Sequence, residues 1–131
     1  MTELSRRRLL CATGVSLATL AGCSADETPE ARFRDALASA EIEIRALSAA
    51  RDGWELEYLT TAVTTATLRA EAETIALAYA DHHPDGMHAL GAVAIAGGED
   101  ALTAEWRARA VWTARDESAY LDRVRETTDA F

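Results

Sequence analysis

The fold of this chain is decided by residues 41–58, which read EIEIRALSAARDGWELEY. Apolar and charged residues alternate over 41–46 and again over 54–58, and a period of two is typical of strands with one buried face. Arg51, Asp52 and Gly53 lie between the two runs, where a glycine-containing turn connects the strands of a hairpin. The stretch therefore predicts a β-hairpin.

Helical spacing of apolar residues flanks this hairpin on both sides. Pro29 suits the first turn of a helix that we expect over 29–39. After the hairpin, Thr64 or Thr65 can cap a helix that runs to about residue 81. A third helix is expected over about 116–130.

A second hairpin is expected from the runs 87–96 and 104–113, joined by a glycine-containing turn at 97–100, although Gly91 weakens the first run as a strand. The order of elements is then helix, two strands, helix, two strands, helix. This order predicts an α+β domain in which helices pack on one face of an antiparallel four-stranded sheet made of two hairpins. The order of the strands within the sheet stays open.

Charged side chains of both signs would share the sheet face that the helices leave uncovered. The expected members are Glu43, Glu55, Glu57, Arg107 and Arg109. Opposite charges on one face attract across strands, so we expect the arginines to meet the glutamates. Such a face could bind a peptide, a polar ligand or a partner protein, and the alternative is a solvated face held by internal ion pairs.

The composition limits the class of protein. The 131 residues are 49% apolar but include 29 alanines, so they suit one small domain with a thin core. The 22 acidic residues outnumber 13 basic ones, all of them arginine, and a net charge of −9 repels nucleic-acid phosphates. We therefore expect no nucleic-acid partner. A lysine-free acidic surface favours a halophilic source, and an ordinary acidic protein from a GC-rich genome is the alternative.

The N-terminus has the parts of an export signal. A basic cluster, Arg6, Arg7 and Arg8, precedes an uncharged run over 9–20, which is too short to span a bilayer as a helix. Residues 5–10, SRRRLL, resemble the twin-arginine translocation motif, with Arg6 and Arg7 as its signal residues. General secretion is the alternative route.

The export signal ends in Leu20, Ala21, Gly22 and Cys23, which resemble the lipobox of prokaryotic lipoproteins. The resemblance implies cleavage before Cys23, so that 1–22 is a signal peptide, and attachment of lipid to the Cys23 thiol. Two hydrocarbon chains hold a protein stably at a membrane. Residues 23–28 would then be a short tether, and 29–131 a domain at the outer face of the cytoplasmic membrane. The alternative is a buried free cysteine.

Residues 54–59, WELEYL, followed by an alanine-rich helix with Tyr79 and Ala80, are similar to small haloarchaeal domains of unknown function. The resemblance covers about 90 residues and contains no catalytic motif. Together with the N-terminal motifs it implies a haloarchaeal secreted lipoprotein of the twin-arginine type. It names no activity.

The histidines gather in residues 81–88, DHHPDGMH. Zinc needs three or four convergent ligands, whereas neighbouring His82 and His83 at a helix end point about 100° apart. We therefore expect these side chains to interact with the helix C-terminus, and we expect no metal, no cofactor and no catalytic residues. The sequence predicts a non-enzymatic, lipid-anchored interaction or accessory module. The alternative is a small metal-dependent hydrolase that uses the His82–His88 turn.

Overall fold

The computed structural model describes residues 28–131. The expected signal peptide over 1–22, with Arg6, Arg7 and the lipobox, and the tether up to residue 27 lie outside the described residues. The elements follow in the order α2 (Pro29–Ser39), β1 (Glu43–Ala50), β2 (Gly53–Thr60), α3 (Thr65–His82), β3 (Ala89–Ala96), β4 (Ala104–Arg109), the 3₁₀ helix η2 (Ala110–Ala114) and α4 (Glu117–Arg125). Within the described range, every helix is too short or too polar to cross a bilayer.

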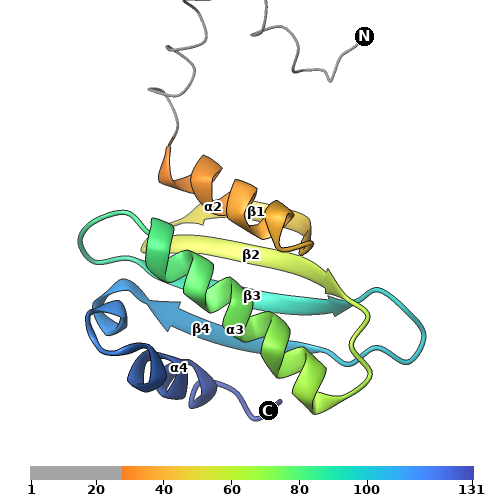
Figure 1. Ribbon diagram of the computed structural model, residues 1–131. Helices are drawn as coiled ribbons and strands as arrows, with labels where there is room; N and C mark the ends of the chain where they lie inside the picture. Colours follow the sequence, from red (N-terminus) through yellow and green to blue (C-terminus); the bar gives the residue numbers. More distant parts are fainter. Residues whose placement is uncertain (1–27) are drawn as a thin grey trace, which may run out of the picture.

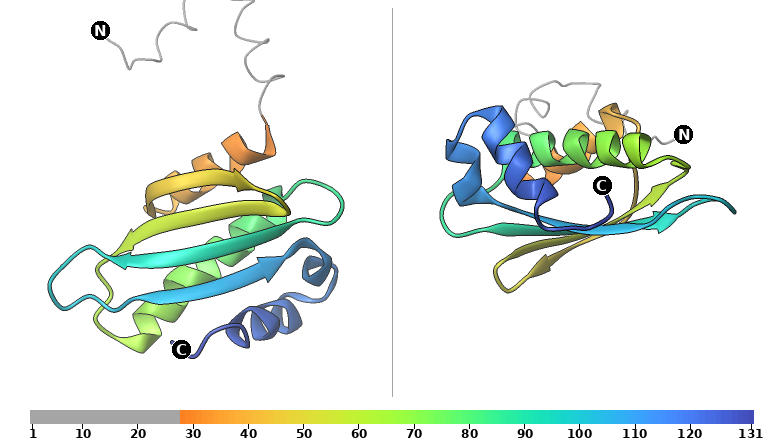
Figure 2. Two further views of the ribbon diagram at one scale, coloured as in Figure 1. Left: turned by 180° about the vertical axis from the view of Figure 1, so that it is seen from behind. Right: turned by 90° about the horizontal axis from the view of Figure 1, so that it is seen from below.

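The strands form one sheet in the order β1-β2-β3-β4, and the helices lie on one of its faces (Figures 1 and 2). The right-hand view of Figure 2 shows the other face without a helix. The expected α+β class, the order of elements and the one-sided helix layer are therefore confirmed. In Figure 1, α2 begins at the end of the sheet where β1 runs into β2.

The centre of the sheet differs from the expected antiparallel arrangement. The hairpins β1-β2 and β3-β4 are antiparallel, but β2 and β3 pair in parallel. The reason is α3, which connects β2 to β3: its 18 residues rise about 27 Å, close to the roughly 26 Å that the eight residues of β2 span. The helix therefore returns the chain to the end where β2 began, so β3 runs in the same direction as β2.

Each α-helix begins at a side chain that caps its first turn. The caps are Thr28 for α2, Thr64 for α3 and Asp116 for α4. Each accepts a hydrogen bond from the backbone N–H three residues later, at 3.1, 3.2 and 2.9 Å respectively. These bonds satisfy donors that a helix leaves free at its start, which is why the sequence locates these three starts well.

The last strand is shorter than the expected 104–113. Ala110 and Trp112 continue the two-residue spacing of the apolar positions past Arg109, but β3 begins at Ala89, the partner of Arg109, so the ladder ends there. The backbone N–H of Ala110 still bonds to the carbonyl of His88 at 2.9 Å, and the chain then turns into η2. The hydroxyl of Thr113 closes that turn by donating to the carbonyl of Ala110 at 2.7 Å.

The last helix also ends before the expected residue 130. The hydroxyl of Thr127 donates to the carbonyl of Val124 at 2.7 Å and accepts a bond from the backbone N–H of Arg107 at 2.9 Å. A threonine side chain that bonds to backbone groups competes with helix continuation. Thr127 thereby ties the end of the chain to the free edge of β4.

The core lies between the sheet and the helices, with two hydrogen bonds that satisfy its large polar aromatics. Trp106 donates its indole N–H to the hydroxyl of Tyr58 at 3.0 Å, and Tyr120 donates to the carbonyl of Ala76 at 2.6 Å. Burial raises the pKa of Tyr58 to about 12, so its hydroxyl stays protonated. Ala72 and Ala76 of α3 are fully buried, and their small side chains let the helix pack closely on the sheet.

We expect Gly53→Ala to lower the free energy of unfolding by about 1–3 kcal/mol or more, because a Cβ there would lie 1.8 Å from the carbonyl oxygen of Ala89, a backbone atom that cannot move aside. Gly98→Ala is the matched control, since a Cβ at Gly98 meets no atom within 4 Å. Chemical denaturation measures both. Equal stability of the two variants would contradict the close approach of β2 and β3.

Candidate functional site

The helix-free face of the sheet, called here the open face, carries all five charged residues that the sequence predicts for it. Strand register puts one pair in a single row: Glu55 on β2 pairs with Gly91 on β3, and Gly91 pairs with Arg107 on β4. All five lie in the rows that alternate with the buried ones and are exposed to solvent. The open face is therefore polar, as expected.

The expected ion pairs between the strands are not formed. Arg109 is level with Ala89, and Glu57 is level with Val93, so neither has an opposite charge beside it in its row. Glu43 lies at the far end of β1, level with Leu59. Within residues 28–131, none of the five predicted residues makes an ion pair within 4.0 Å. The order of the strands, which the sequence leaves open, is the main reason, because β3 lies between the glutamates of β2 and the arginines of β4.

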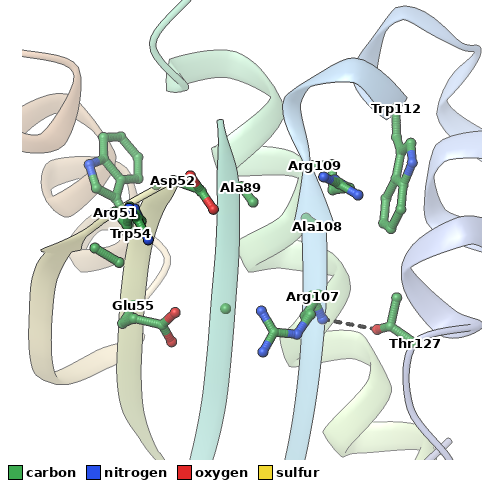
Figure 3. A pocket seen from close by; sticks show the side chains of 13 residues that line it. Arg51, Asp52, Trp54, Glu55, Ala89, Arg107, Ala108, Arg109, Trp112 and Thr127 are labelled. Atoms are coloured by element: carbon green, nitrogen blue, oxygen red, sulfur yellow. Dashed lines mark hydrogen bonds between the residues drawn. The ribbon is translucent and has the colours of Figure 1, made fainter. Parts of the chain in front are cut away.

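A groove of about 430 Å³ lies on this face, between the β1-β2 turn and the segments beside β4 (Figure 3). Its charged lining, which defines what we call the arginine groove, is Arg51, Asp52, Glu55, Arg107 and Arg109. Trp112 of η2 and Thr127 complete the wall at the edge of β4. The groove thus holds three guanidinium groups and two carboxylates, and its net charge is opposite in sign to that of the whole chain.

Gly91 makes a gap in the floor of the groove. A Cβ at this position would lie 2.6 Å from Oε1 of Glu55, so the glutamate carboxylate occupies the space above the glycine backbone. In Figure 3, Glu55 and Arg107 point toward each other across β3 from opposite sides. A smaller hollow of about 140 Å³, also lined by these three residues, continues the groove along the sheet. A side chain larger than hydrogen at Gly91 would fill this gap.

Sequence analysis did not assign four residues of the groove to a site. Arg51 and Asp52 form a turn and carry no motif, and Trp112 was expected on a strand face rather than in η2. Thr127 reaches the groove because its hydroxyl bonds to the backbone of β4. The one available signal was Gly91, because a glycine inside a strand often marks a place where another group approaches the backbone closely.

Two histidines of the histidine-rich turn, His83 and His88, already use ring nitrogens in hydrogen bonds. The ring nitrogens of His83 lie 2.8 Å from the carbonyl oxygen of Pro84 and 3.1 Å from Oγ1 of Thr113. Nδ1 of His88 lies 2.7 Å from the hydroxyl of Tyr79. Within residues 28–131, no three histidine, cysteine or acidic side chains are grouped so that they could hold a metal ion. A metal-dependent hydrolase at this turn would have to break these bonds.

His88 belongs to an aromatic cluster at the end of the sheet. Its ring stacks on Tyr79, with centroids 5.7 Å apart, and meets Trp54 edge to face at 4.7 Å. Burial and the nearby His83 lower the pKa of His88. Burial raises the pKa of Tyr79, so its hydroxyl remains protonated and can donate to Nδ1 of a neutral His88. The cluster is thus built around a neutral imidazole.

The comparisons with known proteins give a family and no activity. A family model described as Domain of unknown function (DUF8159) matches residues 24–130. No curated protein and no solved structure matches the chain. The matched range takes in every strand and helix of the described fold together with both walls of the arginine groove.

The half-buried, neutral His88 predicts that the domain loses stability in mild acid. Because its pKa in the folded state lies below the ordinary 6.5, the unfolded chain binds more protons as the pH falls below about 6.5. The free energy of unfolding should therefore decrease as the pH falls from about 6.5 toward the lower folded pKa, and stay level above about 6.5. Denaturation midpoints across this range measure the slope.

In the same measurement, His88→Phe should flatten the slope, because the titrating ring is removed while an aromatic ring stays in the cluster. His82→Gln removes one histidine outside the described ring contacts and should keep the slope of the parent protein. An unchanged slope in His88→Phe would contradict the assignment.

Proposed function

The chain belongs to the DUF8159 family, and from this premise we propose that it is a lipid-anchored, non-enzymatic binding module at the outer face of the cytoplasmic membrane, with the open face as its binding surface. The observation that carries the proposal is the arginine groove. Five charged side chains of both signs surround one hollow, and none of them is paired with another within the described residues. Unpaired charges in a concave site are available to a partner.

The N-terminal motifs support the anchor. Arg6 and Arg7 suit twin-arginine export, and Leu20 to Cys23 suit lipid attachment at Cys23. The described fold begins at Thr28, five residues beyond Cys23, and five extended residues reach no more than about 17 Å. The lipid would therefore hold the domain close to the bilayer, and two hydrocarbon chains suffice for stable attachment.

The one-sided layering of the fold supports the binding surface. The helices cover the other face, where the side chains of Trp106, Leu56 and Leu90 are at most 1% exposed. The open face contributes no side chain to that core, so its charged residues are not needed to hold the sheet and helices together. A sheet that is held by helices on its other face can present polar groups to a partner without reorganisation, which lowers the cost of binding.

Mass spectrometry of the mature N-terminus tests the anchor. We expect a first residue Cys23 that carries the mass of attached lipid, and we expect the protein in the membrane fraction of its native cells. Cys23→Ser should abolish the lipid and accumulate the uncleaved precursor. A mature chain that starts at Met1 and stays in the soluble fraction would overturn the anchor and leave the fold untouched.

Cross-linking in intact cells tests the binding surface. The double variant Arg107→Ala/Arg109→Ala should lose the neighbours that the parent protein recovers, because two of the three cations of the groove are removed. Arg69→Ala is the matched control, since Arg69 lies on α3, on the helix side of the sheet. Both variants should unfold within about 0.5 kcal/mol of the parent, as exposed substitutions usually do. Identical recovery from the double variant and the control would contradict a binding role of this face.

A further inference from the structure

Both carboxylates of the arginine groove lie on one side of β3 and two of its three arginines lie on the other, while Arg51 lies beside Asp52 on the β1-β2 turn. Asp52 and Glu55 lie on the β1-β2 turn and on β2, whereas Arg107 and Arg109 lie on β4. The strand between them, β3, contributes only the small residues Ala89 and Gly91 to the floor. Figure 3 shows the acidic side chains on one side of β3 and the two β4 arginines on the other. We call the side with both carboxylates, which also holds Arg51, the acidic wall, and the β4 side, which holds only arginines, the basic wall.

The arginines of the basic wall have no acidic partner within the described residues, although the chain is rich in acidic residues. Acidic residues outnumber arginines 22 to 13 in the chain, and elsewhere Arg125 bonds to Glu73 at 2.6 Å and also to Asp122. By contrast, Arg107 and Arg109 form no ion pair within residues 28–131. Guanidinium groups are well suited to bind a carboxylate, often with two parallel hydrogen bonds.

The distance between the walls limits the ligand. Neighbouring strands lie about 4.8 Å apart, so β2 and β4 are separated by roughly 10 Å, and Glu55 and Arg107 reach inward from them over Gly91. Charges placed in this way suit a ligand whose ammonium and carboxylate are several bonds apart. The two ends of a dipeptide meet this requirement, whereas an α-amino acid carries both charges on one carbon.

We propose that the arginine groove binds a zwitterion of dipeptide length, with its carboxylate at Arg107 and Arg109 and its ammonium at Glu55 and Asp52. The inference rests on the proposed function as a binding module and names the ligand class of that site. Trp112, beside Arg109, offers an apolar wall to the side chain of the residue that carries the carboxylate. The absence of a side chain at Gly91 leaves space for the Glu55 carboxylate on the floor of the groove, from where it points toward Arg107.

Titration of the purified full chain with glycyl-leucine, followed by calorimetry, tests the proposal. Three probes are the controls: N-acetylglycyl-leucine lacks the ammonium, glycyl-leucinamide lacks the carboxylate, and leucine is too short. We expect saturable binding of glycyl-leucine and affinities about tenfold weaker for each control, the loss typical of one charged hydrogen bond. Equal affinity for the dipeptide and its blocked forms, or no binding at millimolar concentration, would overturn the proposal.

Three variants assign the two walls. Glu55→Gln should weaken glycyl-leucine about tenfold and leave N-acetylglycyl-leucine unchanged, because only the ammonium contact is lost. Arg107→Gln should weaken glycyl-leucine about tenfold and leave glycyl-leucinamide unchanged, because only the carboxylate contact is lost. Gly91→Ala should displace the Glu55 carboxylate, 2.6 Å from the new Cβ, and weaken binding without unfolding the domain, since a flexible side-chain end can move. Gly98→Ala is the control for a glycine outside the groove.

The outcomes separate this inference from the proposed function. If glycyl-leucine fails to bind while Arg107→Ala/Arg109→Ala still loses its cross-linked neighbours, the ligand class is wrong and the binding module stands. If glycyl-leucine binds with the expected preferences but the mature chain carries no lipid, the ligand class stands and the anchor is wrong. Glycyl-leucine that binds Glu55→Gln as tightly as the parent protein would contradict the role of the acidic wall.

Discussion

The parallel pairing of β2 with β3 is the constraint on which the rest of the structure depends. It is fixed at both ends of the pair: the backbone N–H of Ala89 bonds to the carbonyl of Asp52 at 2.9 Å, and that of Gly97 bonds to the carbonyl of Thr60 at 2.7 Å. Because both strands start at the same end, the β1-β2 turn, the start of β3 and the last residues of β4 meet there. The arginine groove lies at this meeting point.

The same pairing explains why the two faces of the sheet differ. A crossover helix must lie on one side of the sheet that it connects, and α3 covers the face on which Tyr58 and Trp106 are buried. Thr60, at the end of β2, donates to a carboxylate oxygen of Glu71 in α3 at 2.5 Å and links the strand to the helix that follows. With every helix of residues 28–131 on this side, the polar residues in the alternate rows face away from the helices and are exposed to solvent or a ligand.

Local patterns in the sequence predicted the elements, and distant contacts decided what the patterns could not. The alternation in 41–58 gave both strands of the first hairpin to within a few residues, and Pro29 and the cap expected at Thr64 or Thr65 gave the starts of the first two helices. The two-residue spacing of Ala110 and Trp112 was misleading, because β3 supplies no partner strand there. The shared face of the five charged residues followed from periodicity, whereas their rows depended on a register between segments far apart. The groove draws on four such segments, which no single motif reveals.

The difference between the two sheet faces affects which sequence positions can change within this family. Alternate positions along each strand form two sets. One set packs against α3 and α4, and the other faces outward and does not support these helices. Substitutions in the outward set can therefore accumulate at little energetic cost, since exposed positions away from special backbone sites tolerate change. Relatives could keep this scaffold and recognise different molecules by exchanging a handful of side chains around one glycine.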